Sequence, residues 1–113
     1  MTHRLLGAGG VLILASLADG DRHGYGIRKD VNARTAGEIT IGVTSLYRLL
    51  AQLLDEGLVE ESPRRPAPEL DDERRRYYRL TAAGRRALAA EVRRMERVLA
   101  AARPGTARAR PRS

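Results

Sequence analysis

Apolar positions in the first third of the chain predict two helices. Residues 5–18 are apolar on almost every face, which is typical of a central helix that is covered on all sides. Ile27 and Val31 stand four residues apart and predict a shorter second helix over residues 23–34. Residues 38–41 are then expected to form a short strand or an extended link.

The first apolar stretch also resembles a secretory signal peptide, because a basic start precedes it and small residues end it. It is too short to cross a bilayer, which takes a helix of about 20 apolar residues. Without this stretch, the remaining chain would lack a helix to complete its core. We therefore expect a buried first helix in a cytoplasmic protein.

Residues 43–56 show the clearest helical periodicity in the chain. Leucines recur there at spacings of three and four and predict a core face formed by Leu46, Leu49, Leu50, Leu53 and Leu54. The opposite face is polar and carries Thr44, Ser45, Arg48, Gln52 and Asp55. Gly57 is expected to cap the end of this helix.

Two strands are predicted next, over residues 58–61 and 75–80, with Tyr78 and Leu80 on one face and Tyr77 and Arg79 on the other. The segment between them contains three prolines and cannot pair regularly, so we interpret it as the wing of a hairpin. Thr81 is a fitting N-cap for a last helix that is expected to run to about residue 102, where Pro104 and Gly105 close it.

This order of elements predicts a mainly α fold with a small β-hairpin (α+β). We expect a winged helix-turn-helix domain over residues 1–81, a dimerisation helix over residues 82–102 and a disordered basic tail over residues 103–113.

The balance of charge points to a polyanionic partner. The net charge is +7 and the isoelectric point is about 10.9, which favours nucleic acid over a membrane surface because no amphipathic basic helix with bulky aromatic residues is present. Part of the excess comes from the last eleven residues, which hold four arginines and no acid. The chain has no cysteine, so disulfides, zinc fingers and thiolate catalysis are excluded.

No set of residues predicts catalysis. His23 and Tyr25 stand near the start of the second helix, but a lone histidine without a second ligand at helical spacing does not form a metal site, and a capping and packing role is expected instead. The GAGG run at residues 7–10 lacks the spacing and the lysine of a phosphate loop, so we expect it to allow close helix packing. No enzymatic activity, metal or cofactor is expected.

Three segments resemble the PadR family of winged-helix transcription regulators. They are HGYGI at residues 23–27, SLYRLLAQLLDEGLVE at residues 45–60 and RRRYYRLTAAGRRAL at residues 74–88. The resemblance implies a homodimer formed through the C-terminal helix, in the subfamily with a single such helix. It also implies repression of a neighbouring gene that a small-molecule effector relieves.

Carried over by residue, the resemblance assigns Thr44, Ser45, Tyr47 and Arg48 to the start of the recognition helix. It assigns Arg74, Arg75, Arg76 and Tyr77 to the basic return strand of the wing.

Side-chain chemistry gives these residues separate roles on double-stranded DNA. Arg48 can pair bidentately with guanine and Gln52 with adenine in the major groove. Thr44 and Ser45 lie near the positive end of the helix and suit a phosphate, while Tyr47 can pack its ring and extend its hydroxyl to a phosphate. The alternative is that Arg48 and Gln52 are merely solvated, with Asp55 or Glu56 screening the arginine.

The wing carries its own alternative, because arginines on an edge strand also prevent sheet aggregation. Its middle is acidic, with Glu69, Asp71, Asp72 and Glu73 before the arginines. These carboxylates would repel phosphates and can pair with residues 74–76, so we expect contact with the DNA backbone from the strand bases rather than deep insertion.

The last helix predicts a contact between two copies of the chain. Leu88, Val92, Met95 and Leu99 alternate spacings of four and three, the seam of a two-stranded helical contact. An effector pocket is expected where this helix meets the first one, lined by Leu6, Leu88, Val92 and Met95. The competing hypothesis is a winged-helix module that binds an acidic protein partner.

Overall fold

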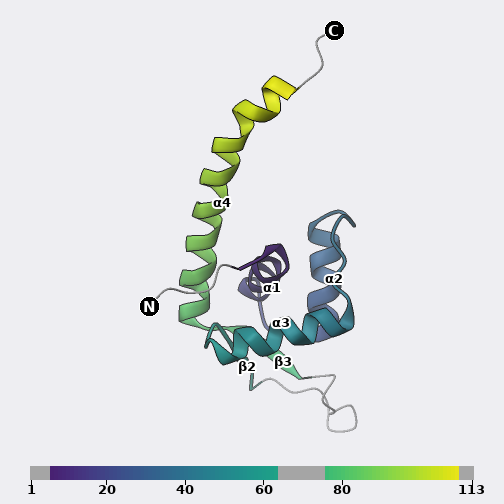
Figure 1. Ribbon diagram of the computed structural model, residues 1–113. Helices are drawn as coiled ribbons and strands as arrows, with labels where there is room; N and C mark the ends of the chain where they lie inside the picture. Colours follow the sequence, from purple (N-terminus) through teal and green to yellow (C-terminus); the bar gives the residue numbers. More distant parts are fainter. Residues whose placement is uncertain (1–5, 64–75, 110–113) are drawn as a thin grey trace.

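Helices α1 (Ala8–Ala18), α2 (Gly24–Arg34) and α3 (Val43–Asp55) surround one apolar core, and α1 lies between α2 and the long helix α4 (Ala82–Ala109) (Figure 1). The computed structural model describes residues 6–63 and 76–109. No helix within these two ranges combines the length and the apolarity needed to cross a bilayer.

The prediction of a covered central helix is confirmed. Ile13, Leu14 and Leu17 of α1 are almost completely buried, and α1 contacts α2, α3, α4 and strand β3. Its glycines allow close packing, since a Cβ on Gly9 would lie 3.2 Å from the Cδ1 of Leu49 in α3. The expected buried role of this stretch therefore holds for its described residues, although the helix begins at Ala8.

The sheet has three antiparallel strands in the order β1 (Arg22–His23), β3 (Tyr77–Leu80), β2 (Val59–Glu61). The predicted hairpin is confirmed as β2 and β3, with Val59 opposite Leu80. Tyr78 and Leu80 are buried while Tyr77 and Arg79 are half-buried, as the alternation predicted. Strand β1 was not predicted, because two residues are too few to show a period; residues 38–41 form an extended link and not a strand.

The end of α3 and the start of α4 meet through capping contacts. Gly57 adopts a φ of 74°, and the Leu58 N–H donates to the Leu53 carbonyl at 3.0 Å, which is the Schellman arrangement that the glycine predicted. The Thr81 hydroxyl accepts from the Gly84 N–H at 3.0 Å and donates to the Gly57 carbonyl at 2.7 Å. The predicted N-cap at Thr81 is confirmed, and it also ties the two helices together.

The predicted end of the last helix near residue 102 is wrong. α4 continues to Ala109 with Pro104 inside it. Proline removes one N–H bond and clashes with the carbonyl four residues earlier, but the preceding Ala100, Ala101 and Ala102 favour helix strongly enough to carry it past this point. Residues 103–109 therefore do not form the expected disordered tail, residues 110–113 lie outside the described residues, and the division into domains stays a prediction.

Candidate nucleic-acid interface

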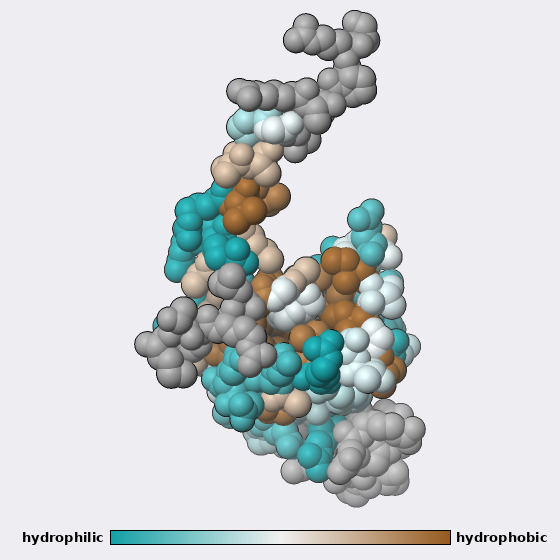
Figure 2. Space-filling model, in the orientation of Figure 1, coloured by the Kyte–Doolittle hydropathy of each residue, from teal (hydrophilic) through white to brown (hydrophobic). Residues whose placement is uncertain are grey.

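The polar face of α3 is presented to solvent because the opposite face supplies the core. Leu46, Leu50 and Leu53 are each no more than 2% exposed, and Leu49 is partly buried against them. Leu54 is 36% exposed, so its predicted place in the core is wrong; it lies at the edge of the buried face. Figure 2 shows hydrophilic surface over α3.

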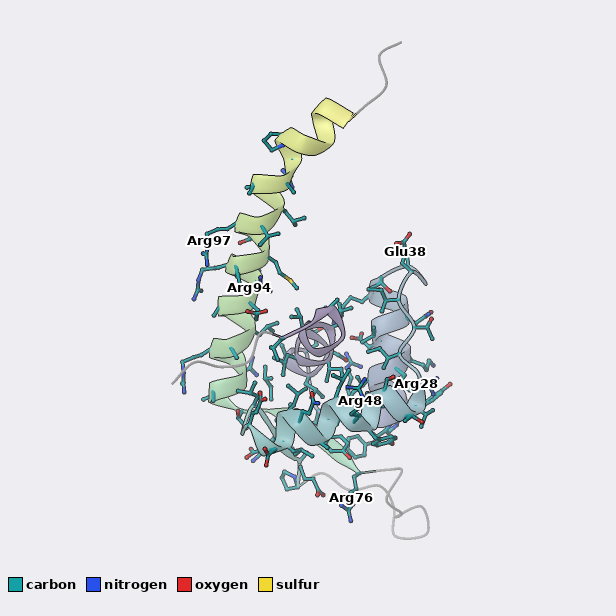
Figure 3. The ribbon with its side chains drawn as sticks, in the orientation of Figure 1. Arg28, Glu38, Arg48, Arg76, Arg94 and Arg97 are labelled. Atoms are coloured by element: carbon teal, nitrogen blue, oxygen red, sulfur yellow. The ribbon has the colours of Figure 1, made fainter. Side chains whose placement is uncertain are left out.

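The structure places four of the predicted DNA-contacting residues on this solvent face. Thr44 and Arg48 are exposed, and Ser45 and Gln52 are half-buried. Arg48 projects from α3 in Figure 3, and within residues 6–63 and 76–109 it makes no ion pair or hydrogen bond, so neither Asp55 nor Glu56 pairs with it. Its guanidinium is available to a ligand.

The N-terminus of α3 has unpaired backbone donors. Its N-cap residue is Gly42, which has no side chain to accept a hydrogen bond, and the first helical bond runs from the Leu46 N–H to the Gly42 carbonyl at 2.9 Å. The N–H groups of Val43, Thr44 and Ser45 therefore have no partner within the helix. With the helix dipole, they favour an anion at this end.

Contacts from α2 fix where this end of α3 lies. The Arg28 Nε–H donates to the Ile41 carbonyl at 2.8 Å, and the Asn32 amide donates to the Thr40 hydroxyl at 3.0 Å. Arg28 is half-buried, and the carbonyl just before α3 holds its guanidinium. This positioning role was missed, since its partner lies 13 residues away in the sequence.

An ion-pair network joins α2 to the end of α1. Asp30 lies 3.0 Å from Arg34 and 3.5 Å from Arg22, and Arg34 also pairs with Asp19. Partial burial disfavours the ionised carboxylate, but the hydrogen bond from Arg34 and the charges of Arg22 and Arg34 outweigh it, so the pKa of Asp30 lies below its usual value. Through Arg34 and Arg22, Asp30 helps to hold the angle between α1 and α2.

An aromatic cluster lies where α2 meets the sheet. The His23 Nδ1 accepts from the Gly26 N–H at 3.0 Å, which confirms the predicted capping role. Its ring packs edge-on against Tyr77 at 5.3 Å between centroids. The Tyr47 hydroxyl reaches α2, where a Cβ on Gly24 would lie 2.6 Å from it. Tyr47 and Tyr77 are thus both half-buried at the edge of the α3 face.

Glutamates of β2 pair with Arg76, which directly precedes β3, and with Arg79 of β3. Arg76 is exposed and its Nη1 lies 3.3 Å from Glu61, while the Nε of Arg79 lies 2.6 Å from Glu60. Arg76 marks the base of the wing in Figure 3. Arg74 and Arg75, and the acidic residues 69–73 that were expected to pair with them, lie outside the described residues.

The predicted dimer residues lie along one side of α4. Val92 and Leu99 are 41% and 54% exposed, and Leu88 and Met95 are half-buried. Leu88 and Val92 line a surface hollow together with Ala18, Leu80 and Arg85. Leu6 packs against the core instead, and neither it nor Met95 lines that hollow.

Glu91 is a buried acid on α4 that the sequence did not single out. Arg94 contacts both of its oxygens at 3.0 Å. The hydrogen bond from Arg94 lowers the pKa of Glu91, and the backbone N–H of Leu6 assists, against the opposing effect of burial. Within the described ranges, no cluster of three histidine or acidic residues could hold a metal ion.

Residues 13–90 match the family model described as the transcriptional regulator PadR-like family, which covers more than half of the chain. The chain belongs to the PadR-like family. No curated protein sequence matches it.

Solved structures of PadR-like and related regulators have a similar fold. A transcriptional regulator from Clostridium thermocellum is 28% identical, with 79% of this chain and 83% of that chain covered and a TM-score of 0.69. A PadR family regulator from Clostridium difficile is 22% identical, with 88% and 99% covered and a TM-score of 0.73. Bacillus subtilis PadR in complex with operator DNA is 23% identical, with 74% and 45% covered and a TM-score of 0.63. The winged-helix fold expected from the sequence is confirmed.

Proposed function

We propose that this PadR-like protein is a sequence-specific DNA-binding transcription regulator, acting in the cytoplasm as a homodimer that represses a nearby gene. The observation that carries the proposal is the exposed face of α3, with Arg48 unpaired on it within the described residues. A major groove about 12 Å wide admits such a helix. The solved complex of Bacillus subtilis PadR with operator DNA supports double-stranded DNA as the ligand.

Each predicted contact has a role in this proposal. Arg48 reads guanine and Gln52 reads adenine, while Thr44, Ser45 and the free N–H groups of the first turn hold a phosphate. Tyr47 packs against Gly24 of α2 and so helps to position α3. At the wing, Arg76 follows the DNA backbone once it exchanges Glu61 for a phosphate, and Arg74, Arg75 and Tyr77 are proposed to lie along the same path.

Two copies are proposed to join through the apolar side of α4, using Leu88, Val92, Met95 and Leu99. The exposure of Val92 and Leu99 in one copy supports this, because burying apolar area contributes about 25 cal/mol per Å². A dimer places two α3 helices on a pseudo-palindromic operator. A small-molecule effector would bind near Leu88 and Val92 and change the angle between the two copies; Leu6 and Met95 are proposed to border that site.

Replacing Arg48 by alanine tests the proposal. The variant should bind the cognate duplex about 1–3 kcal/mol more weakly, roughly 5- to 150-fold in Kd, because a bidentate contact with guanine is lost. Discrimination between cognate and random duplex should fall with it. Fluorescence anisotropy with duplexes taken from upstream of the protein's own gene measures both quantities.

Arg103→Ala is the matched control, since Arg103 is equally exposed but lies near the far end of α4. It should leave cognate binding unchanged. If the parent protein binds no duplex at about 50 mM salt, where phosphate contacts are strong, the proposal fails and the module that binds an acidic protein takes its place. If Arg48→Ala and the parent discriminate equally between cognate and random duplex, Arg48 does not read a base.

A further inference from the structure

The excess positive charge of the chain does not lie on the face that we propose to read DNA. Residues 1–81 hold twelve lysines and arginines and twelve acids, so this part is electrically neutral overall. Residues 82–113 hold nine arginines and two glutamates, which account for the whole net charge of +7. A polyanion attracted by that excess would therefore meet α4 first.

Three of these arginines share one face of α4. Arg86, Arg93 and Arg97 stand at positions i, i+7 and i+11, which places them within a sector of about 40° around the helix and along about 16 Å of its length. We call them the arginine stripe. All three are exposed, and none makes an ion pair or hydrogen bond within residues 6–63 and 76–109.

The acids of α4 do not neutralise the arginine stripe. Glu91 is buried and bound to Arg94, which lies on a different face. Glu96 is exposed and stands three residues after Arg93, but it forms no ion pair within the described residues. Three arginines against one such acid leave this face with an excess of positive charge.

The arginine stripe lies nearly opposite the proposed dimer seam. Figure 2 shows hydrophilic surface on one side of α4 and apolar surface on the other, and Figure 3 shows Arg97 pointing away from the body of the protein. Dimerisation through Leu88, Val92, Met95 and Leu99 would leave the stripe of each copy open. Figure 1 shows that α4 extends away from α3, so we place Arg97 beyond a duplex that lies on α3.

We propose that the arginine stripe binds the phosphate backbone of a second DNA duplex, so that the dimer bridges two segments. This rests on the proposed function for the dimer and for the first duplex, which α3 holds. Guanidinium groups bind phosphate oxygens bidentately, and such contacts need no base sequence. Ala89 and Ala90 lie between the arginines and Ala100 follows them; all three are exposed and small, so the face lacks the bulky apolar anchors that a helix uses on a membrane surface.

The test is a variant with Arg86→Gln, Arg93→Gln and Arg97→Gln, compared with the parent and with a variant in which the same three residues become lysine. An upstream duplex fixed to beads captures the protein, and retention of a fluorescent random duplex of 20 base pairs (about two helical turns) is then measured. The parent should retain the random duplex at about 50 mM salt and release it at about 200 mM. The lysine variant keeps the positive charge of the stripe and should retain most of the random duplex that the parent retains.

The glutamine variant should be captured on the beads as well as the parent but retain about tenfold less random duplex. The slope of log affinity against log salt should fall by about 2.7 per copy, since about 0.9 is lost for each of three phosphates. Equal retention by the parent and the glutamine variant, or none by the parent, overturns the proposal. Retention of polyglutamate in preference to the duplex also overturns it and assigns the stripe to an acidic protein.

Failure of the proposed function gives a different result, because the beads would then capture no protein. In that case, anisotropy with the random duplex alone still tests the arginine stripe. The parent should bind it about tenfold more tightly than the glutamine variant, and equal affinities would reject the stripe as a phosphate-binding surface.

Discussion

Among the glycines of the chain, Gly84 has the least room for a Cβ. A Cβ there would lie 2.1 Å from the Leu58 carbonyl oxygen and 2.6 Å from the Cδ1 of Leu80. The first turn of α4 therefore rests directly on the backbone where β2 begins. Because backbone cannot move aside as the end of a side chain can, only glycine fits here.

Gly84→Ala should lower the free energy of unfolding by about 3 kcal/mol, the upper end for overpacking. Gly105→Ala is the control, since no atom lies within 4 Å of its Cβ position and α4 continues through it. The free energy of unfolding of that variant should rise by about 0.5–1 kcal/mol, as expected when alanine replaces glycine in a helix. Urea unfolding measures both, and equal midpoints for the two variants would contradict this packing.

Residues whose role is local were predictable from the sequence. His23, Gly57 and Thr81 cap helices through partners only a few residues away, so their chemistry and position were sufficient. Arg28 was not predictable, because its partner is the Ile41 carbonyl at the far end of a loop. The accessibility of Arg48 depends likewise on where Asp55 and Glu56 point, which only the structure gives.

At the scale of elements, α4 is fixed to the segment before α1 through one carboxylate. Glu91 is buried, is held by Arg94 and lies near the backbone N–H of Leu6. Its pKa is below the ordinary value of 4.5. The ionised form is therefore stabilised by folding, and protonation weakens the attachment of α4 to the body of the protein.

Glu91→Gln should unfold more easily than the parent at pH 7, by about 1 kcal/mol, the upper end for a solvent-screened pair. A depressed folded pKa gives stability that is fully present above the unfolded value of 4.5 and is lost as the pH falls through the folded value. The difference between parent and variant should therefore shrink below about pH 4.5. The urea midpoints of parent and variant at pH 7 and about pH 3 measure this difference in stability.

Glu96→Gln is the control for that experiment, since Glu96 is exposed and forms no ion pair within the described residues. It should follow the parent at both pH values. A Glu91→Gln deficit that stays constant down to pH 3 would show that the side chain acts through its shape and not its charge.

Elements whose apolar pattern repeats over several turns were predictable from the sequence, and elements without such a repeat were not. The leucines of α3 repeat over three turns and gave that helix almost to its last residue. Strand β1 has two residues and forms only because it pairs with β3, which lies far from it in the sequence. The end of α4 was misplaced because Pro104 is a local signal that the surrounding helix overrides.

At the scale of the whole molecule, charge and apolar surface lie on different sides of α4. The neutral winged-helix part, the apolar seam and the arginine stripe are three separate surfaces on one chain of 113 residues. Net charge predicts a polyanion as the partner. The excess lies in residues 82–113, mostly on α4, rather than on α3.

Leu99→Glu should convert the dimer to a monomer, because a carboxylate would be buried in an apolar seam without a partner. Val98→Glu is the matched control: Val98 is 52% exposed against 54% for Leu99, but it lies about 100° around the helix from it. Sedimentation velocity at micromolar concentration should give a monomer for Leu99→Glu and a dimer for Val98→Glu. If both variants are dimers, the contact lies elsewhere on the protein. If the parent itself is a monomer, the proposed dimer is wrong.

The central claim is that two copies joined along α4 direct two α3 helices at one face of a duplex. Hydroxyl-radical footprinting of the parent protein on the DNA upstream of its own gene tests this most directly. The account predicts two protected patches whose centres lie about 34 Å apart, one turn of the double helix. A single patch, or uniform protection without spacing, would contradict it.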